Sequence, residues 1–325
     1  MTHMPDRVPP RKTSRRTLLL ATVGTTALGL TGCDIRLKKN APDIPGIAAQ
    51  GPPENQAALL ALLAGVRAAT TNDVPTSTSW VSRLAMMHRA QLTTLEAVMA
   101  SEGIAVPAAS VATSAPASST SSPTSSTSST AVTEPTAAQL LTIEKVGLTA
   151  SLLSEVSKLT TSDLPMGAAV LATRVAATRL LGSPITLAPQ STPPTTAIVA
   201  VLPNLRAAVY GLETIIAKTP ENARSRAQAT LTVLYAARSS YEATAAGAAP
   251  VEPPGYDLPI QPTTDAARSR LAQQLLGTLV TTIASQVGQT HHQPAQFAGL
   301  VQLWGDVTGL SWQWGSTPAA FPGLL

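Results

Sequence analysis

His88 is the side chain whose type and position most favour chemistry in this sequence. It lies on the apolar stripe of a helix predicted over residues 76–102. An imidazole placed there could ligate a metal or a haem, with Glu144 or Glu155 supplied by a facing helix. A lone histidine without a partner motif is more often half-buried and hydrogen-bonded to a neighbour. We predict that role and retain His88 only as a weak metal candidate.

Other polar and aromatic side chains have plainer explanations. His291 and His292 follow a predicted helix, where adjacent side chains diverge, so we expect both to be solvated at the helix end. Tyr235 and Arg238 could line an interior polar pocket, but a core tyrosine with a bonded hydroxyl is the commoner outcome. Three tryptophans could form a platform for a carbohydrate or peptide, although we expect them to pack the C-terminal tail onto the helices: Trp304, Trp312 and Trp314.

The sequence motifs of common enzyme classes do not occur. The chain has no Gly-x-Ser-x-Gly elbow, no Gly-rich phosphate loop and no His-Glu-x-x-His pair. Such motifs place a nucleophile, a phosphate cradle or a metal where the chemistry needs it. We therefore predict a protein that is not an enzyme and that carries no cofactor.

Cys33, the only cysteine, closes the segment Leu30-Thr31-Gly32-Cys33 after an apolar run over residues 18–30. A basic segment, an apolar run and small residues in that order are typical of an export signal. The last four residues resemble the lipobox, whose cysteine sulfur receives diacylglycerol before cleavage in front of it. We predict lipidation of Cys33 and cleavage between Gly32 and Cys33; the alternative is a free buried thiol.

The basic segment contains Arg15 and Arg16, and Ser14-Arg15-Arg16-Thr17-Leu18-Leu19 resembles a twin-arginine export motif. General secretion is the alternative route. The apolar run is shorter than the roughly 20 residues that a lasting transmembrane helix needs. Each acyl methylene buried in the bilayer contributes about 0.8 kcal/mol, so two acyl chains would anchor the protein stably. We expect an extracytoplasmic protein, lipid-anchored to the plasma membrane.

The predicted cleavage changes the charge balance. Residues 1–32 contain five of the 22 basic residues and one of the 18 acidic residues, so 17 of each remain. A neutral chain lacks the excess of basic side chains that binds the phosphate backbone of a nucleic acid. Nucleic acid is therefore excluded as a partner, and the absence of a second cysteine excludes disulfides and thiolate metal sites within the chain.

Composition divides the chain into segments. Residues 103–135 are dominated by Ser, Thr, Ala and Pro and cannot bury enough apolar surface to fold, so we predict a disordered insertion. Proline-rich residues 184–194 separate two helical halves. The predicted organisation is a signal peptide at 1–32, a tether at 33–53, an N-terminal helical bundle at 54–182 with its insertion, and a second bundle at 192–325.

Apolar residues recur at three-to-four spacing throughout both halves. The spacing predicts helices over residues 54–70, 76–102, 136–161, 163–182, 195–218, 220–246, 263–289 and 294–311. No segment reads as a strand. We therefore predict an all-α protein made of two four-helix bundles in tandem.

The second half resembles an actinobacterial ferritin-like domain family of uncharacterised function, found in exported lipoproteins. The segments that carry the resemblance are Arg206-Ala207-Ala208-Val209-Tyr210-Gly211, Pro253-Pro254-Gly255-Tyr256-Asp257-Leu258-Pro259 and Ala320-Phe321-Pro322-Gly323-Leu324. The resemblance implies a ferritin-like four-helix bundle. Di-iron sites in such bundles use Glu-x-x-His pairs, which this chain lacks, and the aligned glutamate positions hold Leu205 and Leu276. Leucine cannot ligate a cation, so we expect the fold without the iron chemistry.

These observations predict a non-catalytic cell-envelope lipoprotein that binds or scaffolds a partner at the outer face of the plasma membrane. The expected partners are membrane lipid, through acylated Cys33, and an envelope protein or the cell wall. Two alternatives stay open: a metal- or haem-handling redox protein in a degenerate ferritin-like bundle, and a carrier of an apolar ligand in a cavity between alanine-lined helices.

Overall fold

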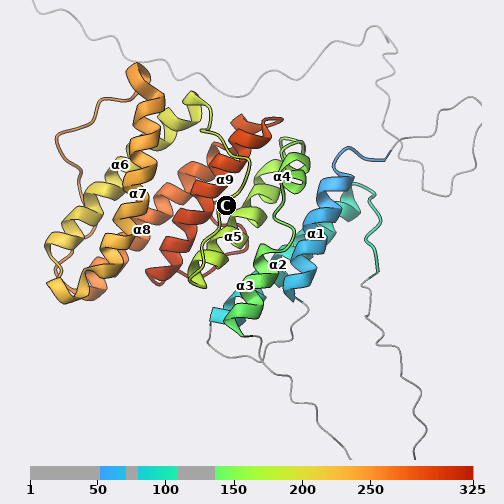
Figure 1. Cartoon of the computed structure of the whole chain (residues 1–325), viewed down its shortest axis with the longest axis horizontal. Helices are drawn as coiled ribbons and strands as arrows, with labels where there is room; N and C mark the ends of the chain where they lie inside the picture. Colours follow the sequence, from blue (N-terminus) through green and yellow to red (C-terminus); the bar gives the residue numbers. More distant parts are fainter. Residues whose placement is uncertain (1–51, 71–79, 109–135, 325) are drawn as a thin grey trace, which may run out of the picture. The chain divides into compact units, whose positions relative to one another are not determined.

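The computed structural model describes residues 52–70, 80–108 and 136–324, and Figure 1 traces the chain. In these residues the regular elements are helices, with no strand, which confirms the predicted all-α class. The α-helices are α1 (Gln56–Thr70), α2 (Trp80–Ser101), α3 (Ala137–Lys145), α4 (Ala150–Val156), α5 (Leu164–Leu180), α6 (Thr195–Ala217), α7 (Ser225–Ala245), α8 (Asp265–Ser285) and α9 (Pro294–Gln313). Short 3₁₀ turns, η1 (Glu221–Ala223), η2 (Ala246–Ala248) and η3 (Val287–Thr290), lie beside α7 and α8.

The prediction of a single helix over residues 136–161 is wrong, because the chain turns between α3 and α4. Gly147 adopts a φ of +81°, a left-handed conformation that glycine reaches without steric cost. Thr149 then caps α4, since its hydroxyl oxygen accepts a hydrogen bond from the amide of Leu152 at 3.2 Å. A glycine followed by a capping threonine thus ends one helix and starts the next.

Helix α5 lies at the centre of the packing. Every residue from Gly167 to Thr178 is buried, so α5 has no solvent face, unlike a surface helix with its single apolar stripe. Its most extensive partner is α9, and Figure 1 shows the two helices side by side. Helix α5 also packs against α3, α1 and α4.

Two glycines allow the close contact between α5 and α9. A Cβ added at Gly305 would lie 2.5 Å from the Cβ of Val175 and 2.8 Å from the carbonyl oxygen of Ala172. A Cβ at Gly309 would lie 3.0 Å from the carbonyl oxygen of Ala176. Glycines four residues apart on α9 therefore face alanines four residues apart on α5.

The hydrophobic core crosses the predicted boundary at residues 184–194. One cluster of buried side chains contains Leu62 of α1, Leu171 of α5, Leu205 of α6 and Leu279 of α8. Helix α6 packs against α7 and α8, and α8 packs against α9. The helices of both halves thus share a core within one compact unit that begins at Pro52, and their grouping into two four-helix bundles stays a prediction.

The chain after α2 remains in the fold beyond the predicted start of the insertion at residue 103. Gly103 takes a φ of +71°, and the amide of Ile104 donates to the carbonyl oxygen of Met99 at 2.8 Å. The Ile104 side chain is only 4% exposed and packs in the core. The rest of the predicted insertion, residues 109–135, lies outside the described residues.

The C-terminal tail crosses several helices. The indole nitrogen of Trp304 donates to the carbonyl oxygen of Pro322 at 3.1 Å, and the amide of Gln91 on α2 donates to the carbonyl oxygen of Ala320 at 2.7 Å. Gly323, with a φ of +79°, approaches the backbone of Thr281 on α8. The prediction that Trp304 helps to pack the tail is confirmed.

Helix α6 is long and apolar enough to cross a membrane by length and composition. However, 56% of its most apolar window is buried inside the fold, where it contacts α7 and α8. We therefore assign α6 as a core helix.

Candidate functional site

A charged cluster lies buried between α2, α3 and α5. It contains His88 and Gln91 of α2, Glu144 of α3, and Thr173 and Arg174 of α5, each at most 2% exposed. The Nε2 of His88 lies 2.7 Å from Oε1 of Glu144, and Nδ1 of His88 lies 3.0 Å from Oε1 of Gln91. His88 is thus more deeply buried than predicted. Glu144 is the facing partner, whereas Glu155 pairs with Lys158 at the surface.

The hydrogen bonds of Gln91 determine where one proton of the His88 ring lies. The Gln91 amide lies 2.7 Å from the carbonyl oxygen of Ala320, which only accepts, so the nitrogen of the amide must be at that end. The same nitrogen lies 2.8 Å from the Thr173 hydroxyl, which itself donates to the carbonyl oxygen of Val170. The amide oxygen therefore faces His88, and Nδ1 of His88 must carry a proton to donate.

The other ring nitrogen must share a proton with Glu144. If neither group were protonated there, the Nε2 lone pair would face a carboxylate oxygen at 2.7 Å in a site without solvent. Either an imidazolium donates to a carboxylate, or a carboxylic acid donates to a neutral imidazole. In both arrangements the two nitrogens of His88 are engaged within the fold.

Arg174 of α5 completes the cluster and contacts the C-terminal end of α3. One terminal nitrogen donates to the carbonyl oxygens of Ile143 and Val146 at 3.0 and 2.5 Å, at the end of α3. Burial lowers the pKa of Arg174, and the nearby charge of Glu144 partly offsets that effect. Gly65 of α1 leaves room for the guanidinium, because a Cβ there would lie 2.7 Å from Nη1.

Two buried atoms of the cluster make no hydrogen bond within the described part of the chain. They are Oε2 of Glu144 and Nε of Arg174, which lie 3.7 Å apart. This distance allows electrostatic attraction but exceeds hydrogen-bond range. The cluster therefore joins α2, α3 and α5 by charge as well as by direct hydrogen bonds.

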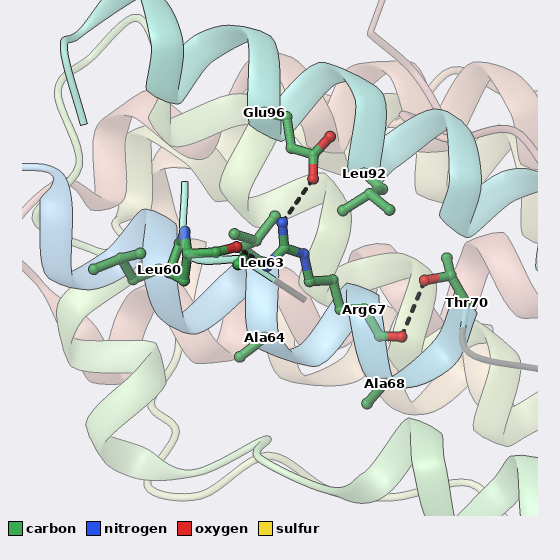
Figure 2. A pocket seen from close by; sticks show the side chains of 10 residues that line it. Leu60, Leu63, Ala64, Arg67, Ala68, Thr70, Leu92 and Glu96 are labelled. Atoms are coloured by element: carbon green, nitrogen blue, oxygen red, sulfur yellow. Dashed lines mark hydrogen bonds and ion pairs between the residues drawn. The ribbon is translucent and has the colours of Figure 1, made fainter. Parts of the chain in front are cut away.

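A groove of about 520 Å³ lies between α1 and α2. Figure 2 shows its lining side chains, which are mostly apolar: Leu60, Leu63, Ala64, Arg67, Ala68, Thr70, Leu92, Glu96, Pro107 and Ala108. Arg67 spans the groove, since one nitrogen donates to Glu96 at 2.9 Å and another donates to the carbonyl oxygen of Pro107 at 2.6 Å. The volume falls in the range of about 300–1,000 Å³ common for small-molecule sites.

A second polar cluster holds the segment that follows α7, the crossover to α8, against the helices. Arg206 donates to Glu242 at 2.9 Å and to the carbonyl oxygen of Pro250 at 2.6 Å. Arg238 donates to Glu242 and Glu252, each at 2.9 Å. Desolvation raises the pKa of Glu242, but the hydrogen bonds from the two arginines outweigh it and hold that pKa below its usual value. These ion pairs connect α6, α7 and the crossover.

The tyrosines near this cluster do not form an interior pocket with Arg238. Tyr235 is 43% exposed and donates to Glu213, and this hydrogen bond raises the pKa of Tyr235. Tyr241 is buried, with no hydrogen-bond partner for its hydroxyl among the described residues, and burial raises its pKa. The prediction of a bonded core tyrosine at position 235 is therefore wrong, because Tyr235 lies at the surface.

His291 and His292 do not diverge as predicted. Their ring centroids are 3.9 Å apart, and His292 adopts a φ of +59°. His292 is exposed, but Nε2 of His291 is buried and has no hydrogen-bond partner within the described part of the chain. The amide of His292 donates to the carbonyl oxygen of Ser157 at 2.9 Å, so the pair lies beside the end of α4.

The positions aligned with ferritin ligands lie in the core. Leu205 and Leu276 are fully buried among other apolar side chains. In residues 52–70, 80–108 and 136–324, no group of three or more His, Cys, Asp or Glu side chains could hold a metal ion. The tryptophan platform is also absent from the surface, since Trp304, Trp312 and Trp314 are at most 6% exposed.

The residues of the predicted export signal lie outside the described residues. They are Arg15, Arg16, Gly32 and Cys33. Comparison with known proteins gave no matching family model, no matching curated protein and no matching solved structure. The resemblance of residues 192–325 to a ferritin-like family therefore stays a prediction.

Proposed function

We propose that this chain is a non-catalytic cell-envelope lipoprotein that binds or scaffolds a partner at the outer face of the plasma membrane. One observation carries the non-catalytic part: His88, the histidine that the sequence singles out for chemistry, is already used by the fold. Both ring nitrogens of His88 are bonded to side chains, Gln91 on one side and Glu144 on the other. A general base or metal ligand needs a lone pair directed at substrate or metal, and this ring directs none.

The proposal includes a ferritin-like arrangement of α6 to α9 that lacks ferritin chemistry. The packing of α6 with α7 and α8, and of α8 with α9, supports it. Leu205 and Leu276 supply apolar surface at the aligned glutamate positions. We expect a bundle filled in this way to be stable without a metal centre.

Fractionation of the full chain tests the lipid anchor. We expect the wild-type protein to stay with membranes through a high-salt wash and to carry diacylglycerol on its N-terminal cysteine by mass spectrometry. Cys33→Ala should release the protein from the membrane fraction or leave its signal uncleaved. Wild-type protein without lipid, found in the cytosol, would contradict the proposal.

Elemental analysis tests the metal-handling alternative. Protein purified without chelators should contain no stoichiometric metal or haem, and turnover that depends on a bound metal would overturn the scaffold proposal. If a metal is present, its loss in His88→Ala with the helical fold intact would identify the ligand. Such a result requires His88 to leave Glu144 or Gln91.

The groove between α1 and α2 favours one second function, the carrier of an apolar ligand. Its lining is mostly leucine and alanine, and its volume suits a small molecule or part of an acyl chain. Native mass spectrometry should then show co-purified lipid. Ala64→Trp would fill the groove and remove that lipid, whereas Ala61→Trp, at an exposed position outside the groove, should not. A spectrum without lipid counts against the carrier.

A further inference from the structure

The first half of α2 has an unusual solvent face. Trp80 is 36% exposed and Met86 is 59% exposed, whereas the neighbouring Leu84, Met87 and His88 are buried. The chain has four tryptophans. The other three are at most 6% exposed, so Trp80 is the tryptophan that reaches solvent.

The face carries one basic side chain, Arg83, and residues 80–95 contain no acidic residue. The guanidinium carbon of Arg83 lies 5.2 Å from the centroid of the Trp80 ring, within cation–π range. Arg83 and Trp80 thus form one surface unit, and Met86 lies one turn further along the helix.

An exposed tryptophan, a basic side chain and a flexible apolar side chain suit the headgroup region of a bilayer. Tryptophan is enriched there because its ring is apolar and its N–H is polar. A basic residue close to an anionic leaflet contributes about 1 kcal/mol. A protein partner would need a larger complementary surface, about 800 Å² on each side for a standard interface.

We propose that the face of α2 formed by Trp80, Arg83 and Met86 docks onto the anionic headgroup surface of the membrane. The inference rests on the proposed function, because acyl chains on Cys33 would hold the helices close to the bilayer. Tethering raises the local lipid concentration, so a weak contact becomes populated without further affinity. The domain then has a fixed side toward the membrane, and its other faces stay available to a partner.

Fluorescence of Trp80 tests this orientation without the anchor. Residues 52–325 are suitable, because they form one compact unit. The probe is vesicles of brominated phosphatidylcholine with or without phosphatidylglycerol. We expect quenching with the anionic vesicles and little with the neutral ones, and Trp80→Phe should remove the quenching, since the remaining tryptophans are buried.

Two variants and one control define the face. Arg83→Gln should weaken binding to anionic vesicles about five-fold, the equivalent of about 1 kcal/mol for one basic residue, and Met86→Ser should weaken it on both kinds of vesicle. Arg270→Gln removes an exposed arginine from α8 and should change little. Circular dichroism checks that each variant folds.

Three results would overturn the docking face: no quenching by anionic vesicles, equal quenching by both vesicles, or quenching that Arg83→Gln and Met86→Ser leave unchanged. A dimer in sedimentation that Met86→Ser dissolves would assign the face to contact between copies of the chain. The anchor is judged separately, by the fractionation of Cys33→Ala. Membrane attachment through Cys33 without vesicle binding would refute this inference and leave the proposed function standing.

Discussion

The close contact between α5 and α9 makes Gly305→Ala a sharp test of the fold. A methyl group at position 305 would meet the Cβ of Val175 at 2.5 Å and the carbonyl oxygen of Ala172 at 2.8 Å. Neither atom is the far end of a flexible side chain, and Val175 is 1% exposed. The two helices must therefore separate locally, or their buried side chains must leave their preferred rotamers.

The expected magnitude follows from two opposing terms. Overpacking a tight core costs about 1–3 kcal/mol, and the upper end applies because backbone is involved. Replacing a mid-helix glycine by alanine returns about 1 kcal/mol of helix propensity. We expect Gly305→Ala to lower the free energy of unfolding by about 1–2 kcal/mol.

Gly277 supplies the matched control. It also lies in a helix, α8, but a Cβ there would meet nothing within 4 Å. Gly277→Ala raises helix propensity without introducing a clash, so it should stabilise the protein by about 0.5–1 kcal/mol.

Chemical unfolding followed by circular dichroism measures both changes, and thermal unfolding should move in the same directions. If Gly305→Ala proves as stable as Gly277→Ala, α9 does not pack against α5 at the described distance. The assignment of α5 as the central helix would then be wrong.

Three further predictions concern buried polar groups. Glu144→Ala leaves His88 and Arg174 without their carboxylate and should destabilise the fold by about 3–5 kcal/mol, as measured by urea unfolding; Glu155→Ala, at the surface, should change stability by less than about 0.5 kcal/mol. Nitrogen NMR of the His88 ring should show a protonated Nδ1 in the folded protein, and an unprotonated Nδ1 would contradict the assigned orientation of Gln91. Tyr241 has a raised pKa in the folded state, so its contribution to stability is present below about pH 10 and is lost as the pH rises further; Tyr241→Phe should therefore flatten the loss of stability in alkaline solution, and an unchanged pH profile would argue against a buried hydroxyl.

The buried cluster around His88 explains how short α3 is held in place. An isolated helix of nine residues is marginal in water. Glu144 of α3 bonds to His88 of α2, and Arg174 of α5 bonds to the last carbonyl groups of α3. The cluster thus has a structural role that accounts for a histidine in an apolar stripe without a ligand.

The sequence alone predicted the elements whose signals are local. Apolar spacing placed α1, α2, α5, α6, α8 and α9 within a few residues of their observed bounds, because a helix face repeats along the chain itself. The sequence also suggested Glu144 or Glu155 as a second ligand beside His88, and the structure places Glu144 there as a hydrogen-bond partner. The break at Gly147 was also readable, from a glycine followed by a capping threonine, and was missed because the apolar pattern continues on both sides of it.

Only the tertiary structure decided which helices touch. That α5 packs against α9, and that Gly305 and Gly309 face Ala172 and Ala176, depends on residues more than a hundred positions apart. The orientation of Gln91, and with it the proton on His88, depends on a carbonyl oxygen of the C-terminal tail. Periodicity shows that a helix has a buried face, but which surface covers that face is decided by packing of the whole chain, since shape and volume must match across all contacts at once.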